Sequence, residues 1–171
     1  MTAPTGCCCC CCGDDSHCQQ PYLTTRNSQG EVIGQTKFIC DECLCVPKFH
    51  ITNRDGQVKY LLRPDTCCGG ICVMPRWGGR RGKCCRVPFL IRDPSTYEPI
   101  STSTSIEDGE ENAQITFLWS GLVNEACYKR HAYHIAFPQD STPEDRLTLI
   151  GSSILVDVAL YEHDDDNNGG S

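Results

Sequence analysis

One segment of the chain, residues 147–160, reads LTLIGSSILVDVAL and is apolar or small at nearly every position. It follows a helix start in which Thr142 can act as the cap, Pro143 suits the first turn and Asp145 completes a capping box. The pattern predicts a helix over residues 143–161, and a helix that is apolar all round lies inside a protein or in a membrane. Its predicted core residues are Leu147, Leu149, Ile150, Ile154, Leu155, Val156, Val158 and Leu160.

The length and the single charge of this segment favour a protein interior over a membrane. At about 1.5 Å per residue, residues 147–160 would extend about 21 Å, which is shorter than a hydrocarbon layer of roughly 30 Å. Asp157 would also cost several kcal/mol in hydrocarbon, whereas the polar end of a barrel can satisfy it. We therefore expect a buried helix, with a membrane span as the alternative.

Two segments upstream of the helix have the pattern of β-hairpins. Residues 22–33 place Gly30 in a turn, where glycine readily adopts a positive φ angle. Residues 49–60 alternate apolar and polar side chains on both sides of Asp55-Gly56, which is a strong hairpin signal. Both segments predict antiparallel strand pairs.

Further strand signals follow along the chain. Residues 89–100 resemble a looser hairpin that turns at Asp93-Pro94. Residues 115–119 and 133–137 are rich in β-branched and aromatic side chains, as strands are. Because repeated hairpins give an antiparallel meander, the sequence predicts a mainly β fold, a barrel or a sandwich, with one central helix.

Composition narrows the class of protein. The chain has 171 residues, 16 cysteines and a formal net charge of −7, and this charge opposes a general attraction to nucleic acid. The consecutive run from Cys7 to Cys12 is poorly suited to disulfide bonds, and no secretory signal precedes it, so a reducing compartment is expected. Motifs for a phosphate-binding loop, a nucleophilic serine, a zinc histidine pair or a dinucleotide are not found. The sequence therefore predicts no covalent catalysis and no organic cofactor.

Several motifs, taken in order, resemble the phospholipid scramblase family. Residues 151–162, GSSILVDVALYE, are similar to the C-terminal helix of that family, an apolar segment with one Asp that ends in an aromatic residue and Glu. Other matching pieces are the cysteine run, Gly34-Gln35, CVPKF at residues 45–49, ITFLWSG at residues 115–121 and FPQD at residues 137–140. The resemblance extends over about residues 7–163.

The resemblance implies a tubby-like antiparallel barrel wrapped around the C-terminal helix. The family has several strands before its cysteine run, so we expect this chain to be N-terminally truncated relative to the family, with an incomplete barrel, open strand edges and one uncovered side of the helix. The expected organisation is a cysteine-rich segment over residues 1–20, a partial barrel domain over residues 21–163 and an acidic, disordered tail over residues 164–171.

The resemblance also implies ATP-independent, bidirectional movement of phospholipids between membrane leaflets. Several acyl chains give stable anchoring where one is marginal, so the predicted lipidation sites are Cys7, Cys8, Cys9, Cys10, Cys11 and Cys12. The expected location is the cytoplasmic face of the plasma membrane, with intracellular membranes as the alternative. Expected partners are the phospholipid membrane and further copies of the chain, because one short helix cannot by itself build a lipid path. The alternative function is a lipid-anchored tubby-like module that binds lipid or protein without moving lipid.

Two kinds of metal site are considered. A zinc site would draw on the clustered thiols Cys40, Cys43, Cys45, Cys67, Cys68 and Cys72, with free, partly buried thiols as the alternative. The calcium-linked segment of the family matches residues 129–140, and this chain has Lys129, His131 and Tyr133 where the family has acidic or polar ligands. Only Asp140 remains as a calcium ligand, so we expect calcium dependence to be weak or absent.

A basic segment, residues 76–83, combines positive charge with a tryptophan on an otherwise acidic protein. This combination suits anionic lipid head groups, and a solvated loop is the alternative. The candidate head-group residues are Arg76, Trp77, Arg80, Arg81 and Lys83.

Overall fold

The computed structural model describes residues 20–39, 46–67, 72–73, 76–77, 85–102, 111–118 and 132–160. Ten strands and one helix lie in these ranges. In chain order they are β1 (Tyr22–Arg26), β2 (Val32–Ile39), β3 (Lys48–Asn53), β4 (Val58–Pro64), β5 (Thr66–Cys67), β6 (Cys72–Val73), β7 (Arg76–Trp77), β8 (Cys85–Arg92), β9 (Gln114–Leu118), β10 (Ala132–Ala136) and α2 (Pro143–Leu160).

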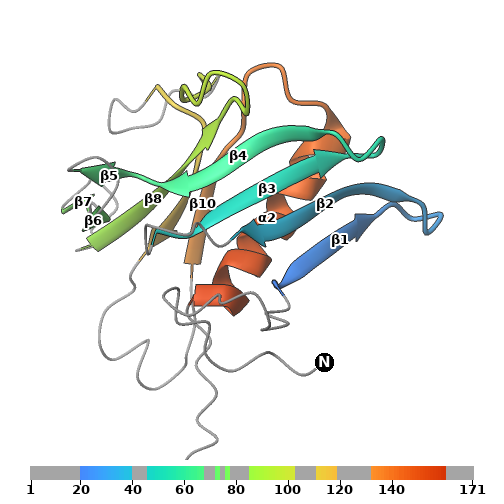
Figure 1. Ribbon diagram of the computed structural model, residues 1–171, viewed down its shortest axis with the longest axis horizontal. Coiled ribbons are helices and arrows are strands. Elements are labelled where there is room, and N and C mark those ends of the chain that lie inside the picture. The colour runs from blue at the N-terminus through green and yellow to red at the C-terminus, as the bar shows by residue number, and fades with distance from the viewer. Residues whose placement is uncertain are drawn as a thin grey trace, which may run out of the picture.

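Most strands belong to one antiparallel sheet that curves around α2. Its order is β1-β2-β3-β4-β8-β9-β10, and β7 pairs with the beginning of β8, while β5 and β6 form a separate ribbon. In Figure 1 the helix lies behind β2, β3 and β4. Within the described ranges β1 and β10 are the edge strands and do not pair with each other, so the sheet is half of a barrel. The predicted class, a mainly β, incomplete antiparallel barrel with a C-terminal helix, is confirmed.

The two predicted hairpins, β1–β2 and β3–β4, turn in the same way. In the first turn Asn27 Oδ1 accepts hydrogen bonds from two backbone N–H groups at 3.0 and 2.9 Å, and in the second Asn53 Oδ1 accepts two at 3.0 Å. Gly30 and Gly56 then take φ angles of 83° and 76°. An asparagine at the first position and a glycine in the left-handed region thus close each hairpin.

The third predicted hairpin, residues 89–100, is wrong in its second strand. Asp93 does close a turn, since its Oδ1 accepts hydrogen bonds from the N–H groups of Ser95 and Thr96. Beyond this turn an isolated bridge joins Arg92 to Pro99, and the Ile100 N–H donates to the Ile91 carbonyl, but no second strand forms; Arg86–Leu90 of β8 pair with β9. Pro99 has no N–H with which to extend a ladder.

The core lies between the inner face of the sheet and α2. Its side chains are at most 2% exposed and come from β3, β4, β8, β9 and α2; they include Phe49, Ile51, Leu62, Phe89, Ile91, Ile115, Leu149 and Val156. Since successive side chains of a strand point to opposite faces, the residues between these positions form the outer face.

Small residues let α2 approach β2 closely. Thr36 on β2 and Ser152 on α2 are both fully buried, and their hydroxyls share a hydrogen bond of 2.7 Å. A Cβ atom at Gly34 would lie 2.5 Å from Thr148 Oγ1 and 2.8 Å from the carbonyl oxygen of Thr52. Any side chain at position 34 would therefore push the helix away from the sheet.

We expect Gly34→Ala to lower the free energy of unfolding by about 1 to 3 kcal/mol, as overpacking of a rigid contact does. Gly151→Ala should cost less, because its Cβ meets side-chain atoms of Thr25 and Leu23 and alanine favours a helix by about 1 kcal/mol. Urea unfolding followed by circular dichroism measures both. Equal stability of Gly34→Ala and the wild type would contradict the close helix–sheet contact.

Candidate functional site

The start of α2 has the capping box that the sequence predicts. The Asp145 N–H donates to Thr142 Oγ1 at 3.2 Å, and the Thr142 N–H donates to Asp145 Oδ2 at 2.8 Å. Asp145 Oδ2 also receives the Lys59 ammonium of β4 at 2.6 Å. The capping carboxylate thus joins the first turn of the helix to the sheet.

This carboxylate has a perturbed pKa. Burial alone would raise the pKa of Asp145, but hydrogen bonds from Lys59 and from the hydroxyl and N–H of Thr142 hold it below its ordinary value. Burial, together with the nearby charges of Asp145 and Asp140, raises the pKa of Tyr60 to about 12. The start of α2 is therefore a fixed negative charge at neutral pH, next to a neutral phenol.

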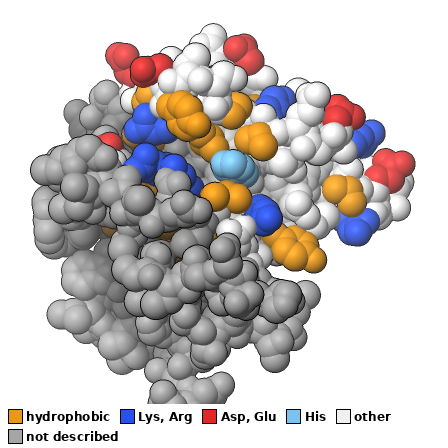
Figure 2. Space-filling model, in the orientation of Figure 1, with side chains coloured by type: hydrophobic (Ala, Val, Ile, Leu, Met, Phe, Trp, Pro, Cys, Tyr) orange, Lys and Arg blue, Asp and Glu red, His pale blue; other side chains and the backbone are white. Residues whose placement is uncertain are grey.

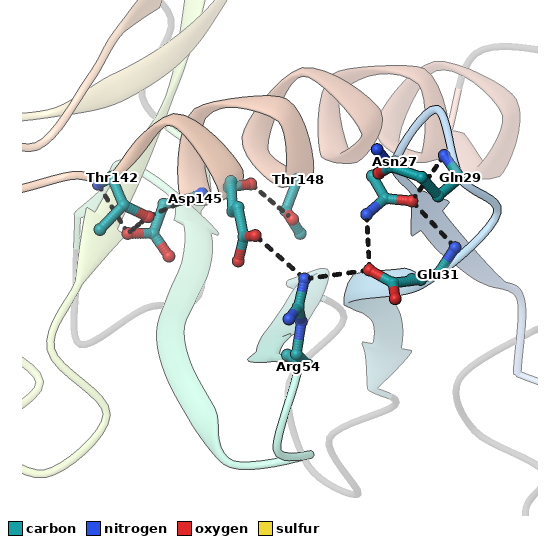
Figure 3. Close-up of polar contacts among 8 residues, drawn as sticks. Asn27, Gln29, Glu31, Arg54, Thr142, Asp145 and Thr148 are labelled. Atoms are coloured by element: carbon teal, nitrogen blue, oxygen red, sulfur yellow. Dashed lines mark hydrogen bonds and ion pairs between the residues drawn. The ribbon is translucent and has the colours of Figure 1, made fainter.

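A surface ion pair adds a second link between the helix start and the hairpin turns. Figure 3 shows Arg54, from the β3–β4 turn, between Glu31 of the first hairpin and the helix. Its Nη2 lies 3.1 Å from Glu144 Oε1 and 3.7 Å from Glu31 Oε2. Each of these side chains is at least half exposed, so the network contributes little stability and mainly orients the turns.

The buried face of α2 fits the prediction for three of its apolar residues and for Leu160. Leu149, Leu155 and Val156 are at most 4% exposed in the core, and Leu160 packs against it. Small residues Gly151, Ser152 and Ser153 fill the same face where β1 and β2 come closest. This face holds the helix in the sheet.

The opposite face of α2 corrects the prediction for four of the expected core residues. Leu147, Ile150, Ile154 and Val158 were expected in the core, and they are 50%, 44%, 53% and 37% exposed. At 100° per residue these four positions fall on one line along the helix, here called the α2 stripe. They are exposed because the described sheet covers only one side of α2. The uncovered side of the helix that an incomplete barrel implies is thus present.

Asp157 receives a hydrogen bond near the end of α2. The Tyr133 hydroxyl of β10 donates to Asp157 Oδ1 at 2.8 Å. The tyrosine ring also contacts Phe117, with ring centroids 5.7 Å apart. The charge that argues against hydrocarbon in the sequence is therefore satisfied by the rim of the sheet. The sequence did not identify this partner. It placed Tyr133 in a predicted strand, at a position where the scramblase family has an acidic or polar calcium ligand.

The metal-site predictions remain predictions. Asp140 lies exposed in the turn between β10 and α2. In the described ranges no group of three or more His, Cys, Asp or Glu side chains is placed to hold a metal ion. Cys67 and Cys72 are register partners in the β5–β6 ribbon, whereas Cys40, Cys43, Cys45 and Cys68 lie outside the described residues.

The predicted lipid-binding residues are placed only in part. The lipidation run Cys7 to Cys12 and the head-group candidates Arg80, Arg81 and Lys83 lie outside the described residues. Arg76 and Trp77 form β7, where Arg76 is the register partner of Arg86 on β8. These two residues therefore pair with the beginning of β8.

Among the described elements, no helix is both long enough and apolar enough to cross a membrane. This finding concerns α2, which is 18 residues long and contains Glu144, Asp145, Arg146 and Asp157.

Comparisons with known proteins connect the C-terminal part of the chain to one family. The protein-family model described as Scramblase matches residues 82–163, which include β8, β9, β10 and α2. Neither a search of curated proteins nor a search of solved structures returns a match. The matched region contains the α2 stripe and the tyrosine that satisfies Asp157.

We expect the stabilising effect of Asp145 to depend on pH. Since its folded pKa lies below the unfolded value of about 3.9, its contribution is present above that value and is lost as the pH falls through the folded pKa. Asp145→Asn should cost about 1 to 2 kcal/mol at pH 7 and lose less further stability than the wild type between about pH 5 and pH 2. Urea unfolding at a series of pH values measures this, with exposed Asp140→Asn as the control. Parallel pH profiles for Asp145→Asn and the wild type would refute the assignment.

Proposed function

We propose, from the match of residues 82–163 to the family model described as Scramblase, that the protein moves phospholipids between the two leaflets of a membrane, in both directions and without ATP. The family match is the observation that carries the proposal. Such movement runs down a concentration gradient, so it requires no nucleophile, general base or organic cofactor. The absence of catalytic motifs in the sequence agrees with this.

We place the activity at the cytoplasmic face of the plasma membrane, where acyl chains on Cys7 to Cys12 would hold the protein. One acyl chain gives marginal binding and two or more give stable binding, so a run of cysteines suits permanent attachment. Residues 13–21 connect the run to β1, and an extended chain of this length spans at most about 30 Å. The β domain would then remain at the membrane surface.

We assign the α2 stripe to contact with a second copy of the chain. A polar head group crosses hydrocarbon only along a protected path, and one half-barrel with a single helix does not enclose such a path. Arg146 and Asp157 flank the stripe near its two ends. In an antiparallel pair of stripes centred between Ile150 and Ile154, Arg146 of each copy lies near Asp157 of the other. The stripe is thus complementary to itself in shape and charge.

The first test is lipid exchange in liposomes. Full-length protein should accelerate the access of dithionite to fluorescent lipid of the inner leaflet, with and without calcium, relative to protein-free liposomes. Ile150→Ser/Ile154→Ser should lower this acceleration several-fold and shift the protein toward the monomer in detergent. Its free energy of unfolding should change by less than about 1 kcal/mol, because both side chains are about half exposed.

The matched control is Val32→Ser/Val58→Ser, which removes two apolar side chains that are 37% and 36% exposed but lie on the sheet. This variant should retain exchange. Exchange at the protein-free rate by the wild type would overturn the proposed activity, and equal losses in the two variants would overturn the role of the stripe.

The second test concerns the anchor. Replacing Cys7 to Cys12 by serine in a eukaryotic cell should move the protein from the membrane fraction to the soluble fraction, because no acyl chain can then form a thioester. Replacing Cys67 and Cys72 of the β5–β6 ribbon is the control and should leave partitioning unchanged. If the serine variant remains on membranes to the same extent, acyl anchoring by this run is refuted.

The α2 stripe also suits a second function, a lipid-anchored module that binds an apolar partner without moving lipid. The same liposome assay separates the two functions. Membrane-bound protein that leaves exchange at the protein-free rate would favour the module.

A further inference from the structure

The outer face of the sheet, opposite the core, gathers basic side chains from four strands. Lys37 on β2 is the register partner of His50 on β3, His50 is opposite Leu61 on β4, and Leu61 is opposite Arg92 on β8. Lys48, Arg63 and Arg86 occupy the same face, since each is an even number of residues from one of these positions in its own strand. We call this surface, formed by Lys37, Lys48, His50, Arg63, Arg86 and Arg92, the cationic face.

The cationic face contrasts with the net charge of the chain. Figure 2 looks onto this side of the sheet: lysine, arginine and histidine side chains lie among apolar ones, and most of the visible acidic side chains lie toward the margin. The described strands place no Asp or Glu on this face, and acidic residues enter only where strands end, at Asp65 after β4 and Asp93 after β8. The described strands therefore present basic and no acidic side chains on this face, although the whole chain carries a net charge of −7.

Three cations of this face form no ion pair with a described carboxylate. Among the described residues, ion pairs of 4.0 Å or less join Arg54 and Lys59 to carboxylates near α2, and none involves Lys37, Arg63 or Arg92. Arg63 Nε and Nη2 are buried without a hydrogen-bond partner among the described residues. Because bidentate binding by a guanidinium uses Nη2, an anionic oxygen at the surface would meet Arg63 at Nη1, through a single charge-assisted hydrogen bond.

The titration of His50 reports the same positive field. Burial and then the charges of Lys48 and Lys37 lower the pKa of His50. Burial is thus the main cause of the lowered pKa, and the two lysine charges act in the same direction.

Two features beside this face also suit contact with a membrane surface. Arg76 of β7 is the register partner of Arg86 of β8, so the chain at Arg76 lies beside a strand of the cationic face. On the other border, Tyr22 is opposite Lys37 and is 64% exposed, and tyrosine is favoured at membrane interfaces. Tyr22 is also the start of β1, which follows the cysteine run in the chain.

We propose that the cationic face binds the anionic head groups of a membrane surface, with Lys37, Arg63 and Arg92 as contacts for lipid phosphate and carboxylate groups. The sheet is then held face-on to a phosphatidylserine-containing leaflet, and α2 lies on the side away from the head groups. This attachment adds to the acyl anchor of the proposed function, and it does not depend on lipid being moved. A basic residue at an anionic membrane surface increases affinity by about fivefold.

Sedimentation with vesicles tests the proposal on the full chain made in bacteria, which carries no acyl chains. The protein should bind vesicles of phosphatidylcholine with phosphatidylserine more tightly than vesicles of phosphatidylcholine alone. Binding should weaken as salt rises, since the screening length falls from about 10 Å at 0.1 M to about 3 Å at 1 M. Lys37→Gln/Arg63→Gln should lower affinity about ten- to thirty-fold.

The matched control is Arg26→Gln/Arg54→Gln, which removes the same charge from exposed positions at the hairpin turns, outside the cationic face. It should reduce affinity much less. Because Arg63 is half-buried, Lys37→Gln/Arg92→Gln serves as a second variant, and thermal unfolding confirms that all three are folded.

Four outcomes would overturn the proposal. The first two are equal losses of affinity in the face and control variants, and equal binding to both kinds of vesicle. The third is displacement of the protein from vesicles by inorganic phosphate at constant ionic strength. The fourth is binding of nucleic acid without binding of vesicles. Failure of lipid exchange, in contrast, would overturn the proposed function and leave the cationic face intact, because sedimentation measures attachment alone.

Discussion

The architecture depends on the contact between α2 and β2, where only small side chains separate the two backbones. Gly34 lies under Thr148, and the buried hydroxyls of Thr36 and Ser152 hydrogen-bond to each other. This contact satisfies two polar groups that would be costly to bury alone. It also fixes the rotation of the helix about its axis, so that Leu149 and Val156 enter the core.

Once the rotation of α2 is fixed, the protein has two unlike surfaces. On the helix side, the α2 stripe presents aliphatic side chains beyond the cover of the half-barrel. On the sheet side, alternation along the strands points several cations outward between apolar residues that point inward, as Lys48 and His50 do around Phe49. An apolar surface suits another protein surface of the same kind, and a cationic surface suits anionic head groups.

Sequence patterns predicted the elements whose causes are local. Gly30 and Gly56 were sufficient to predict the first two hairpins, and Thr142 with Asp145 predicted the helix start. The third hairpin was wrong because Asp93 specifies a turn but cannot specify the partner of β8, which is a strand beyond residue 111. Along β3 the sequence shows cations alternating with apolar residues. It does not show which residues of β4 and β8 lie beside these cations.

Residues a few positions apart therefore determine where this chain turns, where its helix begins and that it is mainly β, because capping, turn geometry and alternation act over one or two turns of backbone. Packing between segments far apart in the chain decided the rest. It buried one half of the apolar helix and left the α2 stripe exposed, gave Asp157 its bond from Tyr133, and brought Lys37, Arg63 and Arg92 onto one surface. The physical reason is that the burial of a side chain and its cross-strand neighbours depend on a second segment of the chain. In this protein that second segment is a different strand or the helix.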